Sequence, residues 1–164
     1  MSIDLEQYRR DAEAFLVALE DEAYRHFSGL KPVCDFTAIY ERSPDLFTAS
    51  SVAELDRLYA EARGDEKRRL AYLLAFAVDG YMGAETRQLG DEVANTENRT
   101  TITVDGEEIG PRAAPVAMAN EPDRARRQRI EEARLAATAE HLNPLLGAQW
   151  RRCHELARGL GRKD

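Results

Sequence analysis

The chain has 164 residues, which is the usual size of one domain. Hydrophobic residues make up 43% of it and charged residues 32%, a mixture too apolar for a disordered chain and too varied for a fibrous one. No stretch approaches the run of about 18 apolar residues that a membrane span needs. The acidic start (Asp4, Glu6) does not suit a signal peptide. We therefore expect a cytoplasmic, globular protein that has no membrane partner.

The net charge of −7 is unevenly distributed along the chain. Residues 1–119 contain 13 basic and 23 acidic side chains, whereas residues 120–164 contain 10 and 7. The densest basic run, residues 124–129, is flanked and interleaved by acids, which is typical of a solvated helix face and not of a nucleic-acid interface. We expect no nucleic-acid partner. Cys34 and Cys153 are too far apart for a C-x-x-C pair, so both are expected to be reduced.

The first half of the chain predicts helices. Apolar residues recur every three or four positions from Asp4 to about Ser28, with Ser2 as the cap, and they are expected to form one buried face: Leu5, Tyr8, Ala12, Phe15, Leu19, Ala23 and Phe27. One or two helical turns are expected over residues 35–41, before a turn at Ser43-Pro44-Asp45. The next helix is expected to open at the capping box Ser51-Val52-Ala53-Glu54 and to end at Gly64.

The longest helical pattern runs over residues 66–98. At 1.5 Å per residue such a helix would span about 50 Å, which exceeds the width of a compact domain of this size. Either the fold is elongated or the helix bends near Gly80, Gly83 or Gly90. The Gly80/Gly83 spacing also suits the close approach of a neighbouring helix.

The helical pattern is interrupted at about residues 100–109. β-branched residues precede Asp105-Gly106 and Glu107-Glu108-Ile109 follows it, which predicts a β-hairpin, because a type I′ turn needs positive φ at two central residues. Asn120-Glu121-Pro122-Asp123 then marks a helix start, and Asn143-Pro144 is expected to kink or restart that helix. The predicted fold is mainly α: residues 1–164 form a single antiparallel helical bundle with one β-hairpin.

Catalytic motifs are absent from the sequence. His154-Glu155 begins like a zinc-protease signature, but position 158, where the second histidine belongs, is Arg158. No G-x-S-x-G and no glycine-rich phosphate loop occurs. We therefore assign no catalytic, cofactor-binding or metal-binding residue in this chain.

Two sets of residues leave weaker alternatives open. His26, His141 and His154 come from different predicted helices and would form a three-histidine metal site if the bundle brought them together. Asp79, Glu85 and Glu92 would line a cation site, although a solvated face is the commoner role of such residues on an acidic chain.

One stretch resembles a known family. The hairpin Thr103-Val104-Asp105-Gly106-Glu107-Glu108-Ile109, the apolar segment Pro115-Val116-Ala117-Met118-Ala119 and the helix start Asn120-Glu121-Pro122-Asp123-Arg124-Ala125-Arg126-Arg127 follow one another. This order is similar to the N-terminal region of zinc oligopeptidases of the thimet oligopeptidase and oligoendopeptidase F type. The family's catalytic half carries H-E-x-x-H, which this sequence lacks, so none of its catalytic residues can be carried over.

The resemblance implies the N-terminal part of a longer metallopeptidase. Such a part would be a non-catalytic helical domain that walls the substrate cleft and restricts access to short peptides, inactive as a hydrolase by itself. Its partners would be a downstream catalytic domain and short peptides, and zinc would belong to the missing half. Two alternatives remain: a stand-alone helical binding or oligomerisation module, such as a homodimer docked through the hairpin, and a small three-histidine metal-dependent enzyme.

Overall fold

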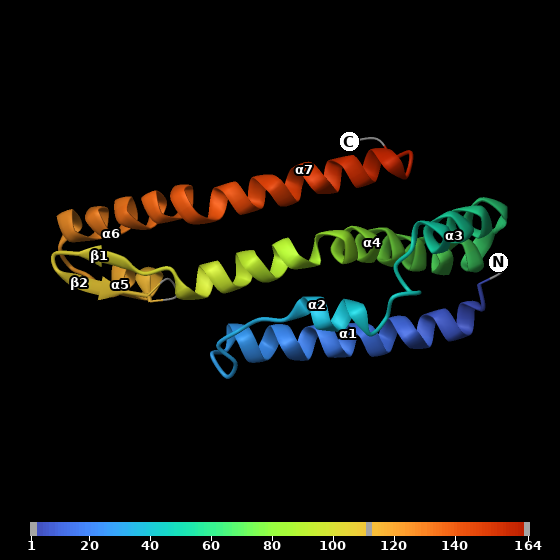
Figure 1. Ribbon diagram of the computed structural model, residues 1–164, viewed down its shortest axis with the longest axis horizontal. Coiled ribbons are helices and arrows are strands. Elements are labelled where there is room, and N and C mark those ends of the chain that lie inside the picture. Colours follow the sequence, from blue (N-terminus) through green and yellow to red (C-terminus); the bar gives the residue numbers. More distant parts are fainter. Residues whose placement is uncertain (1–2, 111–112, 163–164) are drawn as a thin grey trace. The chain divides into compact units, whose positions relative to one another are not determined.

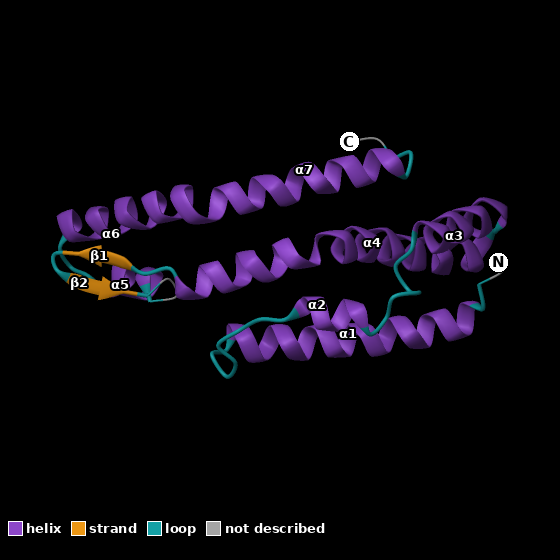
Figure 2. Ribbon diagram, in the orientation of Figure 1, coloured by secondary structure: helices purple, strands orange, loops and turns teal. Residues whose placement is uncertain are grey.

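The computed structural model describes residues 3–110 and 113–162 (Figure 1). It is a mainly helical bundle with one two-stranded antiparallel sheet, which confirms the predicted fold class (Figure 2). Contacts divide the chain into two compact units, Met1–Gln88 with Arg152–Asp164 and Leu89–Arg151. Helices α4 (Gly64–Arg99) and α7 (Asn143–Gly159) each contain a boundary between the units. None of the described helices is both long enough and apolar enough to cross a membrane.

Helix α1 (Leu5–Phe27) opens the first unit. Asp4 caps it, because its Oδ1 accepts hydrogen bonds from two backbone N–H groups of the first turn, at 3.0 and 3.1 Å. Ser2, the predicted cap, lies outside the described residues. Tyr8 and Phe15 are buried as expected, but Phe27 is half exposed. The prediction that Phe27 continues the buried face was therefore wrong.

Helices α2 (Phe36–Glu41) and α3 (Ala49–Glu61) follow α1. The predicted capping box at Ser51 was wrong, because α3 begins at Ala49 with Thr48 as its cap. Thr48 Oγ1 accepts from Ser51 N–H at 3.0 Å, and the Ser51 hydroxyl donates to the Asp45 carbonyl. Two capping residues three positions apart compete for one helix start, and the earlier one forms the cap here.

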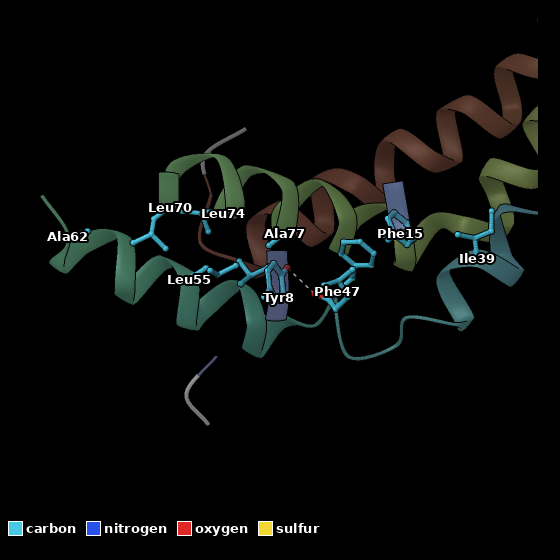
Figure 3. Packing of buried hydrophobic residues seen from close by; sticks show 11 residues of the cluster. Tyr8, Phe15, Ile39, Phe47, Leu55, Ala62, Leu70, Leu74 and Ala77 are labelled. Atoms are coloured by element: carbon cyan, nitrogen blue, oxygen red, sulfur yellow. Dashed lines mark hydrogen bonds between the residues drawn. The ribbon is translucent and has the colours of Figure 1, made fainter. Parts of the chain in front are cut away.

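A cluster of buried side chains from α1, α2, α3 and α4 forms the core of the first unit (Figure 3). Its aromatic centre is Phe15, whose ring centroid lies 4.5 Å from Phe47 and 4.9 Å from Tyr40, in edge-on or tilted contacts. The Tyr8 hydroxyl donates a buried hydrogen bond to the Leu46 carbonyl at 3.0 Å. These contacts join α1 to the 40–47 segment.

Two glycines of α4 lie against this aromatic cluster. A Cβ added at Gly80 would overlap the Phe47 ring, and one added at Gly83 would overlap the Tyr40 hydroxyl. Tyr40 belongs to α2, so the predicted close approach of a helix is confirmed at Gly83, whereas Gly80 faces Phe47 of the segment between α2 and α3. The α-helix is continuous from Gly64 to Arg99, through both of these glycines and through Gly90.

The second unit contains the hairpin. Strand β1 (Ile102–Val104) pairs with β2 (Glu107–Ile109) in the register Val104 opposite Glu107. Asp105 and Gly106 have φ values of 54° and 84°, as the predicted type I′ turn requires. The hairpin buries Ile102, Val104 and Ile109 against a small core that includes Ala114 and Ile130.

The elements after the hairpin complete the second unit and lead into α7. The apolar segment quoted in the sequence forms a short helix, α5 (Ala114–Asn120), which sequence analysis did not identify as helical. Asp123 caps α6 (Arg124–Ala137), three residues after Asn120. A π-helical turn, η1 (Thr138–Leu142), joins α6 to α7, so the kink predicted at Asn143-Pro144 takes the form of a widened turn just before the proline.

The glycine contacts predict opposite effects for two Gly→Ala changes in α4. Gly80→Ala should lower the free energy of unfolding by about 1–3 kcal/mol, because the new methyl group overlaps the buried Phe47 ring. Gly90→Ala is the matched control: its Cβ would come no closer than 3.9 Å to Gln149 Nε2, so the higher helix propensity of alanine should stabilise by up to about 1 kcal/mol. Urea denaturation followed by circular dichroism measures both. Equal effects of the two changes would contradict the assigned contact.

Candidate functional site

The three histidines lie in different environments. His26 is fully buried in the last turn of α1, whereas His141 in η1 and His154 in α7 are exposed. Across residues 3–110 and 113–162, no three His, Cys, Asp or Glu side chains are grouped so that they could hold a metal ion. The three-histidine alternative therefore receives no support from the arrangement of the described side chains.

The three acidic residues of α4 that were considered for a cation site differ in their surroundings. Glu85 Oε2 lies 2.9 Å from Arg152 Nη2 of α7, within the first unit, so this carboxylate is already occupied by an ion pair. Asp79 and Glu92 are exposed. The solvated helix face that the sequence favoured describes these two residues well.

A set of ion pairs links the hairpin to α6. Asp105, at the hairpin turn, receives two hydrogen bonds from the Arg129 guanidinium, at 2.8 and 3.1 Å. Arg126, one turn earlier on α6, pairs with Glu107 of β2 and with Glu121. The Glu107–Arg126 and Asp105–Arg129 pairs join residues that are 19 and 24 positions apart in the sequence. They therefore connect the hairpin to α6, unlike ion pairs between neighbouring turns of one helix.

This ion-pair clamp (Asp105, Glu107, Arg126 and Arg129) has an electrostatic signature. The hydrogen bonds from Arg129 hold the pKa of the Asp105 carboxyl below its ordinary value. Both partners remain partly exposed to solvent, so the pair orients the hairpin more than it stabilises the unit. The basic run of α6 is thus used within the chain, in agreement with its expected character of a mixed helix face.

The first unit carries a surface groove of about 490 Å³ between α1 and the 42–46 segment. Its floor is apolar, with Phe15, Ile39 and Leu46, and charged Arg42 and Asp45 stand at its edge. Burial raises the pKa of Tyr8, which lines one wall, to about 12, so this hydroxyl stays protonated at neutral pH. None of the described lining residues is a histidine or cysteine. The groove has room for an apolar side chain beside charged groups, among them Asp11 and Asp45.

A second groove of about 510 Å³ lies in the same unit, where the N-terminal turns of α1 and α4 approach each other. Leu5, Leu70 and Leu73 form its apolar surface, and Arg9 and Arg69 lie at its edge. Like the first groove it combines apolar contact with mixed charge. Each has the volume and the apolar lining to accept a side chain of a peptide or protein.

Comparisons with known proteins return nothing: no protein-family model, no curated protein and no solved structure matches this chain. The chain's own residues are therefore the basis for any functional assignment.

Sequence reasoning identified the hairpin but missed both the clamp and the grooves. Arg126 and Arg129 were recognised as part of a mixed-charge run, yet nothing in their spacing points to Asp105 or Glu107. The grooves arise where the 42–46 segment and the helix ends pass α1, and they have no sequence motif. Alternating charge on a helix that follows a hairpin with an acidic turn is the signal from which the clamp could have been proposed.

The clamp predicts a pH-dependent hairpin. Because the folded pKa of Asp105 is depressed, its pairing stabilises the folded hairpin above the unfolded pKa of about 3.9 and is lost as the pH falls through the lower folded value. Asp105→Asn, which keeps a residue tolerant of positive φ, should speed amide hydrogen exchange over residues 102–109 at pH 7 and should do so by a smaller factor near pH 3. Glu108→Gln, on the same strand pair, is the control and should have no effect at either pH. An equal effect of Asp105→Asn at both pH values would contradict the assigned pairing.

Proposed function

We propose that this chain is the non-catalytic N-terminal helical domain of an oligopeptidase-like zinc metallopeptidase. In this role it walls a substrate cleft and restricts access to short peptides. The observation that carries the proposal is the order of the second unit: a hairpin with an Asp-Gly turn, a short apolar helix, and a helix that opens directly after Pro122-Asp123. This is the same order on which the sequence resemblance rests.

The geometry of the second unit supports a wall-forming role. The clamp joins the hairpin to α6 through Arg129 and Arg126, and a small apolar core packs beneath the strands. A two-stranded sheet is marginal by itself, so attachment to a helix is what lets it hold a fixed shape. An element that must exclude large substrates needs such a fixed shape more than it needs reactive groups.

The coding sequence that follows Asp164 tests the proposal directly. Continuation into a helix bearing H-E-x-x-H is expected, because zinc catalysis needs two imidazoles on one helix face and a glutamate as general base. A stop codon at this point, or continuation into an unrelated domain, would contradict the proposal.

A second test uses the joined protein. With the catalytic half present, it should cleave short quenched-fluorescent peptides and leave unfolded casein intact. Deletion of residues 1–164 should either relax this length limit or abolish cleavage of the short peptides. Full activity of the shortened protein with an unchanged length limit would contradict the assigned role.

A stand-alone binding module is the second candidate. It is favoured by the large apolar side chains that the first unit leaves exposed, among them Val17, Tyr24 and Leu30. Size-exclusion chromatography with light scattering bears on the hairpin version of this candidate: a tight symmetric dimer that buries the hairpin would favour it over the peptidase domain.

A further inference from the structure

The largest concentration of exposed apolar side chains lies on α1 and the loop that follows it. Ten large hydrophobic residues are conspicuously exposed in the described chain, and six of them fall between residues 16 and 33. They are Leu16, Val17, Tyr24, Phe27, Leu30 and Val33, with exposed fractions from 42% to 72%. We call this set the outer surface of α1. Exposed apolar residues gathered in this way mark interaction sites in soluble proteins.

The outer surface has the spacing of a helix–helix contact. Val17 and Tyr24 are seven residues apart, so they lie one above the other on the side of the helix away from Tyr8, Ala12 and Phe15, and Phe27 lies one turn after Tyr24 at the edge of this side. A helix that is apolar on two sides is ordinarily covered on two sides. The buried residues that α1 contributes to the core cluster of the first unit, Tyr8 and Phe15, lie on the side away from Val17 and Tyr24.

The loop continues this surface in a fixed conformation. Glu22 Oε1 accepts a hydrogen bond from the Asp35 backbone N–H at 2.7 Å, and both Glu22 oxygens accept from Lys31 Nζ at 2.7 Å. These hydrogen bonds hold the loop in a conformation in which the side chains of Leu30 and Val33 are 71% and 59% exposed. A surface that is already ordered loses little conformational entropy when a partner binds.

The charges on this line indicate what the partner is. Glu13 and Glu20 occupy the positions one helical turn before Val17 and between Val17 and Tyr24, and both are exposed. Glu13 pairs with Arg9 on the solvent side, whereas no described residue forms an ion pair with Glu20. The whole helix carries six acidic side chains and three arginines. An apolar line interrupted by carboxylates is complementary to an apolar line interrupted by lysine or arginine.

The same charges argue against two other occupants. A second copy of this chain would bring another helix with six acidic side chains and three arginines against these carboxylates, so the contact would place an excess of like charge where water is excluded. An anionic lipid surface would repel them in the same way. We propose that the outer surface of α1 binds a basic amphipathic helix of a partner protein, with apolar side chains on Val17, Tyr24 and Phe27 and a lysine or arginine beside Glu20. This proposal does not depend on the peptidase assignment.

Two labelled synthetic helices of about 20 residues serve as probes, one with leucines at helical spacing flanked by lysines and one in which every lysine is glutamate. Fluorescence anisotropy with the full chain should show that the lysine peptide binds at least about tenfold more tightly. The double change Val17→Ser/Tyr24→Ser leaves the net charge unaltered and should weaken binding of the lysine peptide by about tenfold or more. Val116→Ser, at an exposed valine of the second unit, is the control and should leave binding unchanged.

Charge reversal supplies the second arm. Glu20→Lys should weaken binding of the lysine peptide and strengthen binding of the glutamate peptide. Glu108→Lys makes the same change in net charge and should alter the binding of neither peptide. The proposal is overturned if the Val17/Tyr24 double variant binds the lysine peptide as the parent chain does, since the attraction would then be to net charge alone. It is also overturned by a dimer that this double variant dissociates, or by co-sedimentation of the parent chain, but not of the double variant, with phosphatidylglycerol vesicles.

Discussion

The first unit depends on the packing of two aromatic rings against two glycines of α4. Phe47 and Tyr40 reach the backbone of α4 only because Gly80 and Gly83 have no side chains. Phe15 of α1 in turn packs against both rings, so the position of α1 is fixed through them. The helix that carries the outer surface of α1 is therefore held by a closely packed core, in which even one added methyl group changes the stability.

The second unit is held by different means. Its hairpin packs Ile102, Val104 and Ile109 into a small apolar core, and guanidinium–carboxylate pairs with α6, chiefly Arg129 with Asp105, orient it. Such pairs determine orientation and respond to acid, whereas the aromatic packing of the first unit does not. The chain thus combines a unit with a large apolar and aromatic core with one whose small core is supplemented by ion pairs.

The sequence predicted what local chemistry determines and failed where packing decides. The Asp105-Gly106 turn was correct because positive φ at both positions is a local requirement, and the Gly80/Gly83 spacing correctly indicated close approach. The helix cap was misplaced at Ser51 because Thr48 satisfies the same chemistry three residues earlier. Phe27 was assigned to the core because periodicity identifies a face of a helix but not where the neighbouring helices end. The clamp and the grooves join residues distant in sequence, so no local pattern contains them.

The role proposed for this chain is to present surfaces to other molecules, and it predicts that the isolated chain does not itself hydrolyse peptides. Peptide hydrolysis by the isolated, rigorously purified and chelator-treated chain tests it most directly, with mass spectrometry of a mixed peptide pool as the measurement. The account predicts an unchanged pool after prolonged incubation. Cleavage that disappears when a single residue of the chain is substituted would contradict it.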